Sequence, residues 1–168
     1  MMRVWYLFSV WLHLLAAAVW IGGMVLVGLV LPVIRGGDFA HVRTALLYQT
    51  GLRFRWAGWV VLGLLVVTGT FNVGFRGYSW GNLFDGTLWD GRWGLMLAWK
   101  VGLVGLVLVV SAVHDFYLGP RATRLLEEDP EAPEAQRLRR TASYIGRLML
   151  LVSLAILALA VMLVRGGL

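Results

Sequence analysis

Hydrophobic positions in this chain gather into four long runs, and the links between the runs hold most of the charged residues. At a rise of about 1.5 Å per residue, each run is long enough to cross a hydrocarbon layer of about 30 Å as an α-helix. The pattern predicts an all-α integral membrane protein, a four-helix transmembrane bundle that forms a single domain over residues 1–168. The spans are expected at about Val4–Leu31, Trp56–Val73, Trp93–Tyr117 and Tyr144–Val164.

Composition agrees with this class of protein, because 60% of the residues are hydrophobic and 14% are charged, which is too apolar for an ordinary soluble domain. The excess of 15 Lys and Arg over 9 Asp and Glu would suggest a nucleic-acid partner in a soluble protein. Here the arginines concentrate in the first and third links, so we expect no nucleic acid and place these links in the cytoplasm. The positive-inside rule then predicts an N-out, C-out arrangement. We expect the protein in the inner membrane of a prokaryotic cell.

His13 lies in the first run, where the roughly 28 residues from Val4 to Leu31 carry no formal charge. An ionisable side chain is costly in hydrocarbon and marks a functional site by default, with a polar partner to be found. One hypothesis is a hydrogen bond to a neighbouring hydroxyl such as that of Ser9. The sharper hypothesis is that the imidazole binds a metal or a cofactor.

Lys100, the only lysine in the chain, is predicted to lie at the depth of His13. Helical rise places His13 about 28 Å from the inner end of the first span near Pro32. The same count places Lys100 about 26 to 28 Å from the inner end of the third span near Tyr117. The two side chains are therefore expected at one level, in the outer half of the bilayer.

His114 does not share this level, because it lies near the inner end of the third span, about 20 Å from His13 along the bundle. We keep it as the reserve axial ligand of a cofactor. For Lys100 the alternative is that its long stem extends to the outer surface past Trp93 and Met96. Aromatic residues in the outer link, such as Tyr78 and Trp89, form either an interfacial belt or a lid over a site.

The faces that carry His13 and Lys100 also carry small, aromatic and thioether side chains, as a buried haem requires. We therefore expect haem b between the first and third spans. His13 is the expected axial ligand of the iron, and Lys100 is either the second ligand or a partner of a propionate. The remaining expected cofactor-binding residues are Trp20, Trp93 and Met96 in the pocket wall and Arg92, with Arg76, near the propionates.

A second metal site on the inner side is a separate hypothesis. The chain has no cysteine, so such a site would use histidine, methionine, lysine or carboxylate. The candidates are His41 and His114, with Asp115 beside the latter. A solvated interface explains the same residues equally well.

Two segments resemble the copper resistance protein D family of integral membrane proteins. One is Trp11-Leu-His13-Leu-Leu-Ala-Ala-Ala-Val-Trp20-Ile-Gly-Gly-Met with its following Leu31-Pro32, and the other runs from Gly91-Arg92 through Leu97-Ala-Trp-Lys100 to His114-Asp-Phe-Tyr-Leu-Gly-Pro-Arg121. The first-helix histidine and later lysine are also similar to the membrane protoporphyrinogen oxidase family, a four-helix group with bound haem b. The resemblance implies copper handling in one case and haem-dependent redox chemistry in the other.

These observations lead us to expect a haem b redox protein linked to copper, an oxidoreductase that passes electrons from an outer-face Cu(I) donor to a membrane acceptor such as quinone. The expectation of a Cu(I) donor rests on the family resemblance alone. The alternatives are a protoporphyrinogen oxidase-like enzyme of haem synthesis, a haem-free copper permease and a small subunit of a respiratory complex. A homo-oligomer is left open.

Overall fold

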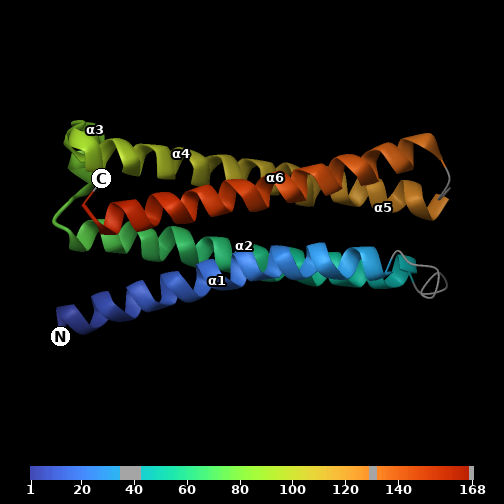
Figure 1. The fold of residues 1–168 in the computed structure, drawn as a ribbon, viewed down its shortest axis with the longest axis horizontal. Helices are drawn as coiled ribbons and strands as arrows, with labels where there is room; N and C mark the ends of the chain where they lie inside the picture. The colour runs from blue at the N-terminus through green and yellow to red at the C-terminus, as the bar shows by residue number, and fades with distance from the viewer. Residues whose placement is uncertain (35–42, 129–131, 167–168) are drawn as a thin grey trace.

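A computed structural model describes residues 1–34, 43–128 and 132–166, and these residues are almost entirely helical (Figure 1). The elements are α1 (Met2–Ile34), α2 (Arg43–Phe75), α3 (Trp80–Phe84), the 3-10 turn η2 (Thr87–Trp89), α4 (Gly91–Val113), the π-helical turn η3 (His114–Leu118), α5 (Gly119–Glu128) and α6 (Pro133–Val164). No strand occurs within the described ranges. The expectation of an all-α chain is confirmed.

Four helical stretches are long and apolar enough to cross a membrane: Met2–Val30, Gln49–Phe75, Gly91–Ala122 and Pro133–Val164. Three of them contain the corresponding predicted spans, and the first, Met2–Val30, covers its predicted span except for Leu31; each is longer than its prediction. Hydropathy identifies only the part of a helix that suits hydrocarbon, whereas the helix itself continues into more polar sequence. Pro32 was expected to end the first helix, but α1 continues to Ile34. A proline so close to a helix end disturbs only the final turn.

The helices form two antiparallel hairpins that lie side by side (Figure 1). The first hairpin is α1 with α2, and the second is α4, extended by η3 and α5, with α6. Both chain termini and α3 lie at one end of the bundle, which we call the termini end. The opposite end, where α1 is followed by α2 and α5 by α6, is the link end. The two termini lie at the same end because the four long helices run alternately in opposite directions.

Two small apolar clusters join the hairpins. The middle cluster contains Leu62, Val107 and Met149, with Trp20 and Met24 among the residues packed against it. The outer cluster, at the termini end, contains Leu88, Leu97 and Leu163. Residues of both clusters also line the cavity described below.

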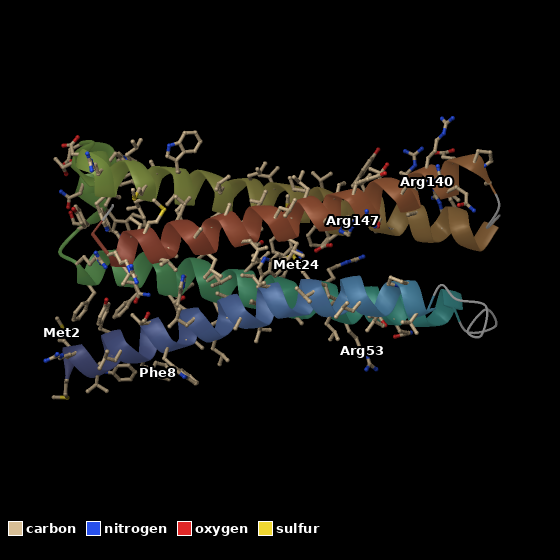
Figure 2. The ribbon with its side chains drawn as sticks, viewed as in Figure 1. Met2, Phe8, Met24, Arg53, Arg140 and Arg147 are labelled. Atoms are coloured by element: carbon tan, nitrogen blue, oxygen red, sulfur yellow. The ribbon has the colours of Figure 1, made fainter. Side chains whose placement is uncertain are left out.

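Many large apolar side chains point away from the bundle, as Phe8 does in Figure 2. A soluble protein would bury such residues, whereas lipid tails accept them. Arg53, Arg140 and Arg147 lie in the half of the bundle toward the link end (Figure 2). The chain is therefore an integral membrane protein with an asymmetric distribution of arginine along its long axis.

The connection between α2 and α4 is a hydrogen-bonded loop. Asn82 Oδ1 accepts from the Ser79 amide at 2.7 Å, and Asn82 Nδ2 donates to Thr87 Oγ1 at 2.9 Å. The Thr87 hydroxyl and amide both donate to Asp85 Oδ1, at 2.6 and 2.9 Å. These bonds hold the pKa of the Asp85 carboxyl below its usual value. At Gly94 a Cβ would overlap the Trp89 carbonyl group, so only glycine lets this loop pack on the start of α4.

Candidate cofactor site between the hairpins

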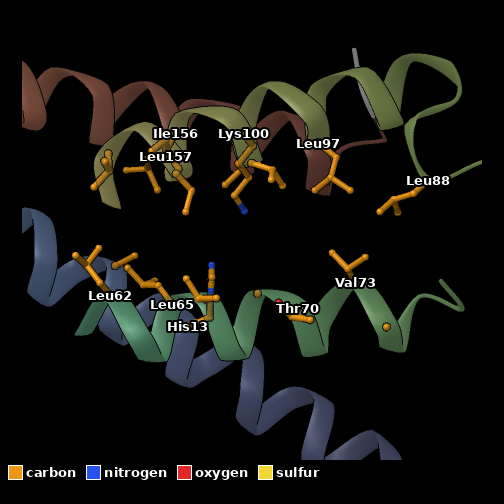
Figure 3. Close-up of a pocket in the computed structure, with 18 of the residues that line it drawn as sticks. His13, Leu62, Leu65, Thr70, Val73, Leu88, Leu97, Lys100, Ile156 and Leu157 are labelled. Atoms are coloured by element: carbon orange, nitrogen blue, oxygen red, sulfur yellow. The ribbon is translucent and has the colours of Figure 1, made fainter. Parts of the chain in front are cut away.

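A cavity of about 420 Å³ separates the α1–α2 hairpin from the α4–α6 hairpin in the half of the bundle toward the termini end (Figure 3). Its wall is mainly apolar, with leucine, isoleucine and valine side chains from all four long helices. Tyr78, Trp80 and Trp89 of the loop between α2 and α4, here called the outer loop after its expected side, also line it. Of the two roles considered for these loop aromatics, the position over the cavity favours a lid.

His13 enters this cavity from α1 with one ring nitrogen already bonded. Its Nδ1 lies 2.7 Å from Thr68 Oγ1 on α2, and Thr68 is 5% exposed. The Thr68 hydroxyl donates to the Leu64 carbonyl one turn back on its own helix, at 2.5 Å. The hydroxyl oxygen therefore accepts from His13 Nδ1–H, which assigns the proton to Nδ1 and leaves the Nε2 lone pair free.

The second ring nitrogen of His13 is directed across the cavity, as Figure 3 shows. Gly69 makes this placement possible, because a Cβ there would lie 3.3 Å from His13 Cε1. The hydroxyl partner expected from the sequence was Ser9, one turn away on the same helix. The structure shows Thr68 instead, because the imidazole reaches across the helix interface rather than back along α1.

Lys100 enters from α4 on the opposite wall, and its amino group points toward His13 (Figure 3). It makes no ion pair with any residue that the structure describes. The side chain thus lies in the cavity rather than along α4 toward the surface. The two residues share one cavity, as the count of helical rise predicted.

Trp20 of α1 lines the cavity and also packs against the middle cluster. Its Nε1 donates to Ser153 Oγ on α6 at 3.1 Å, and Ser153 is 4% exposed. Gly58 on α2 leaves room for the Trp20 ring, since a Cβ at Gly58 would lie 3.2 Å from Trp20 Cζ3. Trp20 therefore fixes the spacing of three helices where the cavity meets the middle cluster.

Three residues expected in the pocket do not line it. Trp93 stacks on Tyr78 with ring centroids 5.3 Å apart, and the Arg76 guanidinium lies 5.4 Å from the Trp93 ring. Met96 packs against the outer cluster, and Arg92 is exposed at the first turn of α4. Helical spacing placed Trp93 and Met96 on one stripe with Lys100 but gave no sign that the outer loop would cover that part of the stripe.

His114 belongs to a different group in η3. Its Nδ1 lies 2.9 Å from Asp115 Oδ1, and Asp115 Oδ2 accepts from Trp59 Nε1 at 3.1 Å. His114 does not line the cavity, so the reserve axial ligand is not brought to the site. His41 lies outside the described residues. Within the described ranges, no three His, Cys, Asp or Glu side chains gather as a metal site would require.

Sequence reasoning missed Thr68 and Gly69. Both lie in the second span, and Thr68 is one of its few polar residues. A depth count of the second span against His13 would have identified Thr68 as a candidate partner. No pattern in the sequence gives the close approach at Gly69.

Four membrane-spanning helices and a polar pair facing each other in an apolar cavity define an integral membrane protein with a candidate cofactor site. The family model for copper resistance protein D matches residues 48–164, which is more than half of the chain. The chain therefore belongs to the copper resistance protein D family. The match covers α2, α4 and α6, including Thr68 and Lys100, but not α1 and His13.

The chain is also similar to an uncharacterized protein of Aquifex aeolicus (strain VF5), with 28% identity over 152 residues. The similarity covers 89% of this chain and 89% of the Aquifex protein. No solved structure matches the chain. The family links this membrane protein to copper resistance, and the similarity to the Aquifex protein extends over nearly the full length.

Proposed function

We propose that this protein is a haem b-binding redox protein of the inner membrane, linked to copper and oriented with both termini outside. The observation that carries the proposal is His13, whose Nδ1–H is held by Thr68 so that a free Nε2 faces an apolar cavity opposite Lys100. A metal-binding histidine is commonly oriented in this way, by a hydrogen bond from its other ring nitrogen.

The cavity suits a flat apolar cofactor better than a bare metal ion. A copper ion needs several ligands at short distance, and soft thioethers or thiolates suit Cu(I). Apart from His13 and Lys100, no such ligand lines the cavity, whose described lining contains no methionine, cysteine or carboxylate. Met24 and Met96 pack in the two apolar clusters instead. The lining therefore favours a haem over a copper permeation path.

Each residue at the cavity has a separate role in binding such a cofactor. His13 supplies a neutral imidazole nitrogen, and Thr68 keeps the ring from turning. Lys100 supplies either a second nitrogen ligand or a cation for a propionate, while Trp20 and the loop aromatics exclude water. A haem b bound there would supply a one-electron iron couple.

The orientation rests on charge. The labelled arginines of Figure 2 lie toward the link end, which the positive-inside rule assigns to the cytoplasm. The cavity is then in the outer half of the membrane, accessible to an outer-face Cu(I) donor, and a quinone in the membrane is the proposed acceptor. Cysteine-labelling reagents that cannot cross the membrane test the orientation, since the chain has no native cysteine. A Ser79→Cys variant should react from outside the cell.

The haem itself is tested by the visible spectrum and the pyridine haemochrome assay of the detergent-purified chain, expressed with adequate haem supply. We expect a Soret band and about one haem per chain. Purified protein without a Soret band would contradict the proposal and favour the copper permease. If haem is present, oxidation of porphyrinogen in the presence of quinone would instead indicate an enzyme of haem synthesis.

A further inference from the structure

A stripe of exposed side chains follows the face of α6 that points away from the bundle. Met149 and Ser153 are buried and define the inward face of this helix. Arg140, Tyr144 and Arg147 recur at spacings of four and three residues, so they share another face, and all three are exposed. Figure 2 shows both arginines in the half of α6 toward the link end. These three residues, here called the α6 stripe, present two cations to the surroundings of the bundle.

The face that carries the α6 stripe changes from basic to apolar along the helix. From Arg147 the same spacing leads to Leu151 and Leu154, which are 64% and 44% exposed. Arg140 lies about 10 Å from Arg147 along the helix, in the direction of the link end. This order matches a phospholipid, whose phosphate lies at the membrane surface and whose acyl chains lie deeper. A soluble anion would contact the arginines only.

Tyr144 and Arg147 form the centre of the α6 stripe. The Arg147 guanidinium carbon lies 5.9 Å from the centroid of the Tyr144 ring. Side chains on a helix lean toward its N-terminus, and the N-terminus of α6 is at the link end. The Arg147 side chain therefore extends toward the membrane surface rather than into the apolar layer. A phosphate beside this pair can accept hydrogen bonds from both the guanidinium and the phenol.

Charge selects between the classes of phospholipid. Within the part of the chain that the structure describes, the ion pairs are Arg121–Glu134 and His114–Asp115, so no carboxylate neutralises either arginine of the α6 stripe. An anionic phospholipid supplies the missing negative charge. A zwitterionic phospholipid also brings an ammonium group, which the two arginines would repel. Charge complementarity therefore favours the anionic lipid.

We propose that the α6 stripe binds an anionic phospholipid in the leaflet at the link end. Its phosphate contacts Tyr144 and Arg147, and an acyl chain lies along Leu151 and Leu154. Arg140, nearer the link end, attracts the rest of the headgroup. The site lies on the outward face of α6 and uses no residue of the cavity, so it is independent of the proposed cofactor.

Binding of defined lipids to the detergent-purified full chain tests this site. Native mass spectrometry gives apparent dissociation constants for phosphatidylglycerol, which is anionic, and for phosphatidylcholine, which is zwitterionic. We expect the wild type to bind phosphatidylglycerol at least about tenfold more tightly, because each arginine near an anionic membrane surface contributes about fivefold. Arg147→Gln should weaken phosphatidylglycerol binding about fivefold. Tyr144→Phe, which removes only the phenol hydroxyl, should weaken it at least about twofold.

Arg165→Gln is the matched control, because Arg165 is an exposed arginine that caps the opposite end of the same helix. This variant should keep the wild-type affinity for phosphatidylglycerol. Equal affinity of the wild type for the two lipids would overturn the site, as would equal weakening by Arg147→Gln and Arg165→Gln. Displacement of the lipid by an equal concentration of glycerol phosphate would also overturn it, because the acyl chain would then contribute nothing.

Discussion

His13 and His114 are the two histidines that the structure describes, and their surroundings differ in nearly every respect. His13 bonds a hydroxyl on another helix, and its free nitrogen faces an apolar cavity. His114 bonds the carboxylate of the adjacent residue, Asp115, in a half-exposed π-helical turn. The His13 arrangement leaves a ring nitrogen facing the cavity, whereas the His114–Asp115 pair is bonded to Trp59 of α2 and lies away from the cavity.

The comparison shows why a membrane histidine must be judged by its partner. A neutral hydroxyl fixes the ring of His13 without supplying charge, so the imidazole can act as a neutral ligand. His114 instead shares its Nδ1 with the carboxylate of Asp115, and it does not line the cavity. The two histidines therefore differ both in their hydrogen-bond partner and in their access to the cavity.

Of the substitutions on the two sides, one that crowds the His13 ring should lower the unfolding free energy most. A Gly69→Val variant places a branched side chain where a Cβ alone would be 3.3 Å from His13 Cε1. We expect a loss of about 1–3 kcal/mol in unfolding free energy, as for other overpacked interiors. Reversible unfolding in an SDS titration measures it.

Gly63→Val is the control for that change. It lies on the same helix and a Cβ there would meet nothing within 4 Å. Equal destabilisation by the two variants would mean that helix propensity, rather than contact with His13, explains the result.

Removing the Thr68 hydroxyl that bonds His13 should lower the unfolding free energy by a smaller amount. Thr68→Val keeps the shape of the side chain but leaves Nδ1–H without its acceptor. Hydrogen bonds between membrane helices contribute about 0.6 kcal/mol on average and up to about 1.7 kcal/mol, so we expect a loss in this range in the same SDS titration.

On the His114 side, Asp115→Asn is the matched variant. This pair is partly exposed, with side-chain exposures of 35% and 22%, and ion pairs of this kind contribute about 0–1 kcal/mol. A loss from Asp115→Asn greater than that from Thr68→Val would reverse the comparison.

Acid should weaken the outer loop slightly and leave the helices unchanged. Hydrogen bonds from Thr87 lower the pKa of Asp85 in the folded chain. The loop is therefore stabilised above the ordinary carboxyl pKa of about 3.9, and this stabilisation is lost as the pH falls through the lowered value. The protection factors of the amide hydrogens in residues 79–89, which are corrected for the pH dependence of intrinsic exchange, should fall at low pH in the wild type, and Asp85→Asn should show lower protection already at neutral pH. A loop with equal exchange in both chains at neutral pH would contradict this.

Much of the fold could be predicted from the sequence, because the lipid environment imposes long apolar runs that are easy to recognise. The depth of His13 and Lys100 followed from helical rise alone. The rotation of one helix against another did not, so the hydroxyl considered as an alternative partner of His13 was that of Ser9 on its own helix rather than that of Thr68. Trp93 and Met96 were expected in the pocket because helical spacing cannot show that a loop will cover them.

The most direct test of the account compares haem content in His13→Ala and His114→Ala, purified side by side and measured by the pyridine haemochrome assay. We expect His13→Ala to lose at least about 90% of its haem, equivalent to a tenfold or greater loss of affinity, and His114→Ala to keep the wild-type content. The central claim would be contradicted if His13→Ala retained its haem, or if the loss occurred in His114→Ala instead.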